Sequence, residues 1–256
     1  MIYKFLTGLA LAALGCSNAL GCFSSNLDTQ AVQWSKLIVV AKLVSIGAAT
    51  PMSAATTEPS DLRSQICEFE IAQTLDGSAK PGDHIRIIRF LASDDDEHTM
   101  CDLDLTTKQI GSPMTLLLTP QADLRWSDDP SDPDPRTADM KNASAYALVF
   151  IASAGPMQPD DLTDLKSLIS DTRSDESQFN PDEAKAQAET LAIAADDTEA
   201  DQAEKSLTEM GPLALPSANA ALAHAGPAGK ERLLRVIHRI SLPAIKPMPA
   251  QSPAKN

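Results

Sequence analysis

Four cysteines and four histidines are the side chains of this chain that could act as strong nucleophiles or hold a transition metal. They are Cys16, Cys22, Cys67, Cys101, His84, His98, His224 and His238. No histidine lies at a metal-ligand spacing from another histidine or from a cysteine. The chain also contains no Gly-x-Ser-x-Gly elbow, no phosphate-binding glycine loop and no dinucleotide fingerprint. The sequence therefore predicts a protein that is not an enzyme and has no cofactor or metal.

Two acidic segments are the remaining candidates for a metal site. In SDDDEH, residues 93–98, His98 follows three aspartates and a glutamate, and a second run places Asp128, Asp129, Asp132 and Asp134 among prolines. The first segment lacks the pattern of a calcium loop. We interpret both as solvated charged loops. A metal site at His98 and weak calcium binding by the second run are the alternatives.

The first 21 residues have the three parts of an export signal. Residues 1–4 carry a positive charge, residues 5–14 are apolar but too short to span a bilayer, and small residues follow. Cleavage before either Cys16 or Cys22 fits the small residues that precede each cysteine. We expect the protein to be exported to the periplasm, the outer envelope or the medium, where disulfides persist. Lipidation of Cys16 or Cys22 is an alternative, although Ala stands where lipoprotein signals usually have Leu.

The overall charge restricts the class of partner. The formal net charge is −14 at pH 7 over 256 residues. Nucleic acids and anionic membranes both attract lysine and arginine, so neither is an expected partner. No later stretch approaches the roughly 20 apolar residues of a transmembrane helix. A lipid anchor remains the one expected route to a membrane.

Residues 22–157 are predicted to be rich in β-strands. The strand-forming segments are 37–46, 66–75, 84–90, 114–120 and 146–153. Within the second segment, Ile66, Phe69, Ile71 and Leu75 are candidate core residues, and Trp34 is expected in the core just before the first strand. Such frequent short strands favour a small barrel or sandwich.

Residues 158–242 change to helical patterns, and we place a domain boundary near residue 158. Helices are expected within 160–170, from Pro181, over 196–210, over 213–226 and over 227–240, with a polar link at 172–180. Gly211 and Pro212 should end the third of these helices. Residues 243–256 are proline-rich and predicted to be disordered. The predicted fold class is therefore α+β.

Several segments of the first half, in order, resemble the netrin-like module, the OB-type barrel of the tissue inhibitors of metalloproteinases. They are the early Cys22, LIVVAKLVSI, the hairpin CEFEIAQTLDGSAKPGDHIRIIRF and MCDLDLTTKQIGSPMTLLL. The resemblance implies that Cys22 becomes the first residue and bridges to Cys101. The chain departs from the family's Cys-x-Cys start, because Ser24 follows Phe23. Cys67 lies within a predicted strand and, if buried, should behave as a small apolar residue.

The second half resembles a HEAT-type helical repeat. The match is AEKSLTEMGPLALPSANAALAHAGPAGKERLLRVIHRI, with Gly211-Pro212, then Ala214-Leu215-Pro216, and Arg232-Leu233-Leu234. In such repeats each helix pair buries one apolar stripe against its neighbour. A single unit rarely stands alone. It should therefore lean on the preceding helices, on the barrel or on another protein.

These features together predict an exported, non-catalytic binding or scaffold protein with a protein partner. The inference rests on analogy between folds, because both modules usually bind rather than react. Cys22 and Trp126 are the candidate contact residues. A first alternative is a metalloprotease inhibitor, in which the amine and carbonyl of a mature N-terminal Cys22 chelate the enzyme's zinc. A second alternative is a hydrolase with an unrecognised site.

Overall fold

Apolar, β-branched runs form the strands of the first half of the molecule. The computed structural model describes residues 27–52, 63–91, 107–125, 136–138, 140–141, 144–194 and 196–242. Its strands are β1 (Leu37–Ile46), β2 (Thr50–Pro51), β3 (Arg63–Asp76), β4 (His84–Leu91), β5 (Pro113–Pro120) and β6 (Ala145–Ser153). Short 3₁₀ turns occupy Thr107–Gln109 (η1) and Gln121–Asp123 (η2). The strand predicted from LIVVAKLVSI has the predicted bounds.

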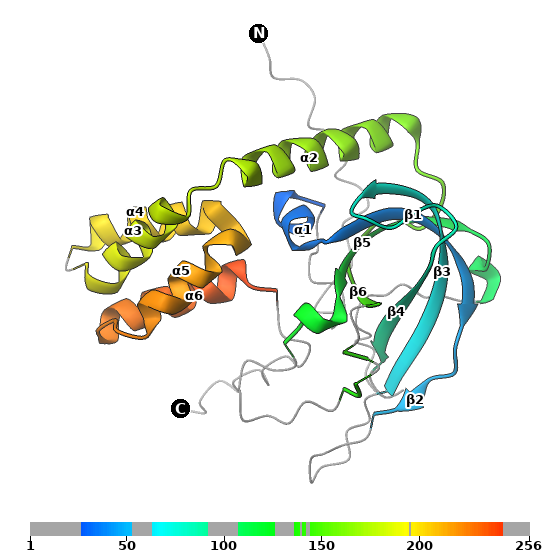
Figure 1. Ribbon diagram of the computed structural model, residues 1–256, viewed down its shortest axis with the longest axis horizontal. Helices are drawn as coiled ribbons and strands as arrows, with labels where there is room; N and C mark the ends of the chain where they lie inside the picture. Colours follow the sequence, from blue (N-terminus) through cyan, green and yellow to red (C-terminus); the bar gives the residue numbers. More distant parts are fainter. Residues whose placement is uncertain are drawn as a thin grey trace, which may run out of the picture.

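Five of these strands close into a barrel (Figure 1). Their order is β1-β5-β6-β4-β3, and β3 pairs again with β1 to complete the ring. The neighbours are antiparallel except β4 and β6, which run parallel over a short stretch. If the five barrel strands are numbered 1 to 5 in chain order, their order around the ring is 1-2-3-5-4. The predicted α+β class with an OB-like barrel is confirmed.

Large aliphatic side chains fill the barrel. Its interior is formed by Leu37, Val39, Ala41, Leu43, Cys67, Phe69, Ile71, Ile85, Ile87, Met114, Leu116 and Leu118. Phe69 and Ile71 lie inside, as predicted, because they share one face of β3 with Cys67. Ile66 and Leu75 are only partly buried and pack against other clusters outside this interior. Ile66 falls on the opposite face of β3 from Phe69 and Ile71 by simple alternation, and Leu75 lies at one of the register shifts in the pairing of β3 with β1.

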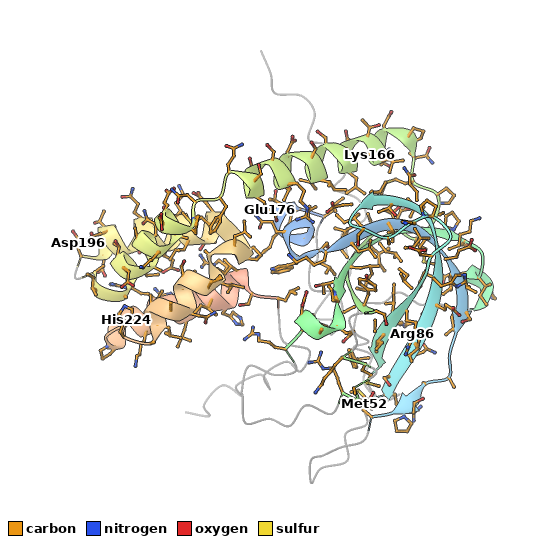
Figure 2. All side chains as sticks on the ribbon, viewed as in Figure 1. Met52, Arg86, Lys166, Glu176, Asp196 and His224 are labelled. Carbon is orange, nitrogen blue, oxygen red and sulfur yellow. The ribbon has the colours of Figure 1, made fainter. Side chains whose placement is uncertain are left out.

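Two helices, α1 (Thr29–Trp34) and α2 (Pro159–Ser177), cover part of the barrel's outer surface. Asp28 starts α1 by accepting a hydrogen bond from the Ala31 amide at 2.9 Å. The cluster beneath the two helices consists of Ala31, Val32, Trp34, Ile38, Leu117, Val149, Leu165 and Ile169. Trp34 is therefore in the core, as predicted. In Figure 2, Glu176 of α2 lies near α1, and Lys166 lies further along the same helix.

The helix α2 is longer than the sequence predicts. Helix was expected over 160–170, but the structure continues it to Ser177, through most of the expected polar link. The extension brings Arg173 against α1 and β3, where it finds charged and carbonyl partners. Such partners come from tertiary packing and leave no periodic signal in α2 itself. By its contacts α2 belongs to the barrel's outer layer, while the domain boundary near residue 158 stays a prediction.

Four further helices pack into a separate cluster, here called the helical unit. They are α3 (Pro181–Ile193), α4 (Asp197–Met210), α5 (Leu215–Leu222) and α6 (Pro227–Ile240), with a 3₁₀ turn, η3 (Gly211–Ala214), between α4 and α5. Asn180 and Asp196 cap α3 and α4 through their side-chain oxygens. As predicted, α4 ends at Gly211, which has a positive φ of 63°.

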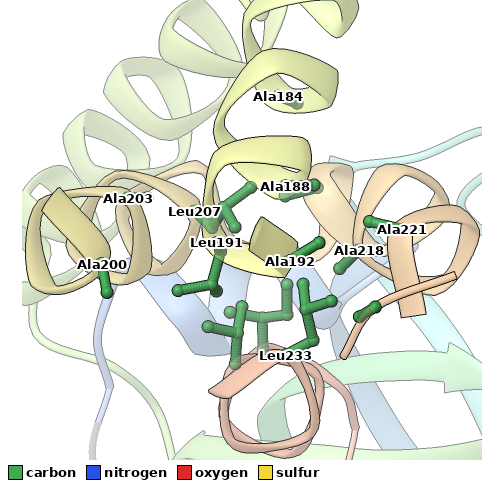
Figure 3. Close-up of a cluster of buried hydrophobic side chains, with 14 residues drawn as sticks. Ala184, Ala188, Leu191, Ala192, Ala200, Ala203, Leu207, Ala218, Ala221 and Leu233 are labelled. Atoms are coloured by element: carbon green, nitrogen blue, oxygen red, sulfur yellow. The ribbon is translucent and has the colours of Figure 1, made fainter. Parts of the chain in front are cut away.

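Small residues dominate the core of the helical unit (Figure 3). It contains Ala184, Ala188, Leu191, Ala192, Ala200, Ala203, Leu207, Ala214, Ala218, Ala221, Ala225, Leu233, Val236 and Ile240. Alanine side chains are small, so the helix axes come close together. At Gly229 the backbone of α6 directly contacts the backbone of α3. A Cβ added to Gly229 would meet the carbonyl oxygen of Ala192. The unit therefore closes around one core of its own, while the resemblance to a HEAT repeat stays a prediction.

No helix in the part of the chain that the structure describes is both long enough and apolar enough to cross a bilayer.

Candidate binding groove between the barrel and the helical unit

Side chains of α1 hold the end of α6 against the barrel. The indole Nε1 of Trp34 donates to the carbonyl of Ile240 at 3.1 Å, and Gln30 Nε2 donates to the carbonyl of Arg239 at 2.8 Å. The last carbonyls of a helix have no partner within the helix. Here the barrel's first helix supplies donors for two of them. The helical unit thus leans on the barrel through a polar contact, in line with the expectation for a single repeat.

A second contact brings α1 against the turn after α4. Gly211 is buried there, and a Cβ on it would overlap the side-chain amide of Gln33. The position also needs a backbone that L-residues rarely adopt. Gly211 therefore satisfies two requirements, the end of α4 and the close approach of α1.

Arg173 fixes α1 from the other side. Its Nη2 donates to the carbonyls of Val32 and Ser35 at 3.1 and 2.7 Å, and its guanidinium pairs with Asp76 and Glu176. Burial alone would lower the pKa of Arg173, but hydrogen bonds and the negative charges of Glu176 and Asp76 raise it above its ordinary value. Arg173 therefore stays charged, and α1 is held between α2, β3 and α6.

A groove of about 330 Å³ lies beside this junction. Its apolar lining comes from both halves of the molecule: Trp34, Pro212, Leu215, Ile237, Ile240 and Leu242. Ligand sites commonly lie between structural units, are mostly apolar and contain a few polar groups. The volume is near the lower end of the roughly 300–1,000 Å³ typical of such sites. The groove therefore fits a small group or the end of a chain.

The charged groups at the groove are two cations and one anion. Lys36 and Arg125 line it together with Asp123, and all three are exposed. Arg125 also donates to the carbonyl of Leu242 at 3.3 Å. Lys36 makes no ion pair with a described carboxylate. Among the described lining residues, Lys36 is thus a cation without a carboxylate partner, in a chain whose net charge is −14.

Uncharged polar groups complete the lining. They are Gln33, Thr119, Asn219 and Ser241. Thr119 lies near the end of β5 and is 0% exposed, and its hydroxyl has no hydrogen-bond partner among the described residues. A buried polar atom without a partner is uncommon and destabilising. Asn219 is exposed on α5, and no hydrogen bond of its side chain is recorded within the described residues.

A second hollow, between α4 and α6, is lined mainly by charged residues that pair with one another. Glu204 of α4 accepts from Arg235 at 3.1 Å and lies 3.8 Å from Arg239, both on α6. The neighbouring Lys205 pairs with Glu209 along α4. The charges already neutralise one another, so this hollow favours a structural role over ligand binding.

None of the described histidines lines the groove. His84 pairs with Glu68 at 3.1 Å on the barrel, and His224 pairs with Glu189 at 2.7 Å on the helical unit. His238 is exposed in the last turn of α6. Figure 2 shows His224 near the outer end of the helical unit, away from the barrel. Among the described residues, no three His, Cys, Asp or Glu side chains are placed to share a metal ion.

Cys67 is buried inside the barrel. It is 0% exposed and unpaired, and burial raises the pKa of its thiol, an effect that the nearby charge of Arg89 partly opposes. A thiol that stays protonated in an apolar interior is a poor nucleophile. Cys67 therefore behaves as the small apolar residue expected for a buried position.

The other sequence-predicted site residues lie outside the described part of the chain. These are Cys16, Cys22, Cys101 and Trp126, together with His98 and the four aspartates at 128–134. The Cys22–Cys101 disulfide, lipidation at Cys16 or Cys22 and a contact at Trp126 therefore stay predictions. The same holds for calcium binding by the acidic loops.

Sequence reasoning named three groove residues, Trp34 as a core residue and Pro212 and Leu215 as parts of the repeat-like motif, but it did not bring them together. The lining comes from three stretches that are far apart along the chain, 33–36, 119–125 and 212–242. Gly211-Pro212 was the one local signal at this place, since a glycine–proline break marks where the chain must turn. Nothing local shows that the turn would face α1.

A search of protein-family models finds no match to this chain, and no curated protein matches it significantly. The groove's role must therefore be argued from its own geometry.

Proposed function

We propose that the chain is an exported, non-catalytic binding protein that holds a protein partner in the groove between its barrel and its helical unit. The observation that carries the proposal is the groove's lining. Six apolar residues border an open hollow at the junction, and they come from α1, η3, α5, α6 and Leu242, the second residue after α6. The apolar lining residues are buried or half-buried, and a hollow of this kind with a polar border suits the insertion of a partner's side chain.

The chemistry of the lining supports binding over catalysis. None of the described residues that line the groove is a histidine or a cysteine. The groove thus offers neither the commonest general base nor a thiol nucleophile. The strongly acidic chain also supports a protein partner over a nucleic acid. Export is supported by the signal-like residues 1–21.

Site-specific photo-crosslinking in the native cell would test partner binding. A photoreactive residue at Asn219, which is exposed and lines the groove, should give one defined adduct with a protein. The matched control is Ala220, which is exposed on the same helix but does not line the groove. Equal adducts at both positions, or none at either, would contradict the proposal.

A reporter fusion would test export separately. Residues 1–26 joined to an alkaline phosphatase, which is active only where its disulfides form, should give activity in the envelope. The control replaces Leu9 and Leu11 of the apolar stretch by arginine, which should abolish translocation. Equal activity of the two fusions would contradict an export signal.

A further inference from the structure

We propose that the groove binds the free carboxyl-terminal end of a peptide whose last residue is apolar. This inference rests on the proposed function and names the part of the partner that the groove recognises. The argument has three parts: the charge at the groove, its size and its neutral polar groups.

Charge selects an anion at this place. Lys36 is exposed at the edge of the lining, although the whole chain is strongly acidic. Lys36 has no described carboxylate within ion-pair distance, so its ammonium is available. A carboxylate next to Lys36 would form a charge-assisted hydrogen bond, which is stronger than a neutral one. Because Lys36 borders an apolar hollow, the ligand should have an apolar group attached to its carboxylate.

Size limits the ligand to a chain end. The hollow holds about 330 Å³ and is bordered by Trp34, whose indole N–H is already used by Ile240. The ring can therefore offer only its apolar surface to a ligand. One apolar side chain and the backbone beside it suit such a volume, whereas an amphipathic helix needs a longer groove with several anchors.

Neutral polar groups favour a peptide over a simple fatty acid. A fatty acid offers hydrogen-bonding atoms only at its carboxylate, whereas a peptide also has amide N–H and C=O groups. The lining offers the side-chain amides of Gln33 and Asn219 and the hydroxyl of Ser241. The buried Thr119 hydroxyl, which lacks a partner, lies in the same lining. These groups match the backbone of a peptide's last residues.

Tryptophan fluorescence provides a direct test. The exported chain with Trp126→Phe keeps Trp34 as its only tryptophan, so a change in emission reports on the groove. The probes are acetyl-Ala-Leu-Leu with a free carboxylate, the same peptide as its carboxamide, and octanoate. We expect saturable binding of the free acid and binding of the carboxamide that is about tenfold weaker, since the ion pair is lost.

Substitutions identify the cation. Lys36→Met should weaken binding of the free acid by about fivefold to tenfold and leave the weaker carboxamide binding unchanged. Lys80→Met removes the same charge at an exposed turn outside the groove lining and should change neither affinity. Thermal unfolding of each variant checks that the fold is retained.

Three results would overturn the inference. Equal binding of acid and carboxamide would show that no carboxylate is recognised. Octanoate binding as tight as that of the peptide acid would assign the groove to free organic acids. No change in Trp34 emission up to about 10 mM of any probe would show that the groove takes none of these ligands. If the Asn219 crosslink still forms in these cases, the proposed function survives and only the chain-end inference fails.

Discussion

The barrel and the helical unit bury apolar surface in opposite ways. The barrel fills its interior with large side chains such as Phe69, Ile71 and Leu116, carried by strands that stay apart. The helical unit relies on alanine and on Gly229, so its helices come close enough for backbone contact. A core built from side-chain volume is sensitive to removal of atoms, whereas one built from close approach is sensitive to added atoms. This difference leads to the following predictions.

Truncation of a buried side chain should lower the free energy of unfolding most when the side chain lies in the barrel. Phe69→Ala removes a ring that is 1% exposed in the barrel interior, and we expect a loss of about 4 kcal/mol in the free energy of unfolding. Urea denaturation followed by circular dichroism measures it. In the helical unit, Ala188→Gly should cost only about 1 kcal/mol, chiefly through helix propensity. Equal losses at both positions would contradict the comparison.

Adding atoms to a small buried residue should destabilise the helical unit. Gly229→Ala places a Cβ against the Ala192 carbonyl, so α6 must move away from α3, and we expect a loss of about 3 kcal/mol. Gly155→Ala is the matched control, because a Cβ there meets no atom within 4 Å. It should change stability by less than about 1 kcal/mol. A Gly229→Ala variant as stable as wild type would show that the close approach is not required.

Arg173, which binds α1 to α2 and β3, should contribute more to the free energy of unfolding than Arg235, which lies on the surface of α6. Arg173→Met leaves the carbonyls of Val32 and Ser35 and the carboxylate of Asp76 without their donor, and we expect a loss of about 2 kcal/mol. Arg235→Met removes an exposed ion pair with Glu204, and its small effect should vanish in high salt. Thermal melts at two salt concentrations separate the two cases.

The junction between the two regions should be weaker than either core. Trp34→Phe removes the donor to the Ile240 carbonyl and should cost about 1 kcal/mol. Gln30→Leu, which removes an exposed donor to Arg239, should cost less. Hydrogen exchange should become faster in the last turn of α6 and stay unchanged in β1. Faster exchange across the whole barrel would contradict a local junction.

The last effect is absent at neutral pH and is an alkaline loss of stability that arises in the barrel. Burial raises the pKa of Cys67 in the folded state, so the folded protein keeps a proton that the unfolded chain releases above its ordinary pKa of about 8.5. Its contribution is therefore complete below that pH and declines as the pH rises, by at most about 1.4 kcal/mol per pH unit. Comparing wild type with Cys67→Val between pH 7 and pH 10 isolates the effect. A constant difference would contradict it.

The two regions also differ in how well the sequence predicts them. Local patterns gave the bounds of β1 and α6 because a β-branched run and a glycine–proline start are unambiguous. The extension of α2 around Arg173 was missed, because its partners lie on β3 and α1. The groove was missed for the same reason. Its lining is assembled from three distant stretches, 33–36, 119–125 and 212–242, and only the break at Gly211-Pro212 has a local signature.

The bond from Trp34 to Ile240 joins the beginning of the described chain to its last helix, 206 positions apart. Such a bond can form only after the chain has been synthesised as far as Ile240. A nascent chain that has not reached this point therefore has a barrel whose first helix has not yet met α6. The groove beside that bond also needs Ile240 and Leu242, so it cannot be complete before these residues are synthesised. We expect products that end before α6 to lack the groove even when their strands have paired.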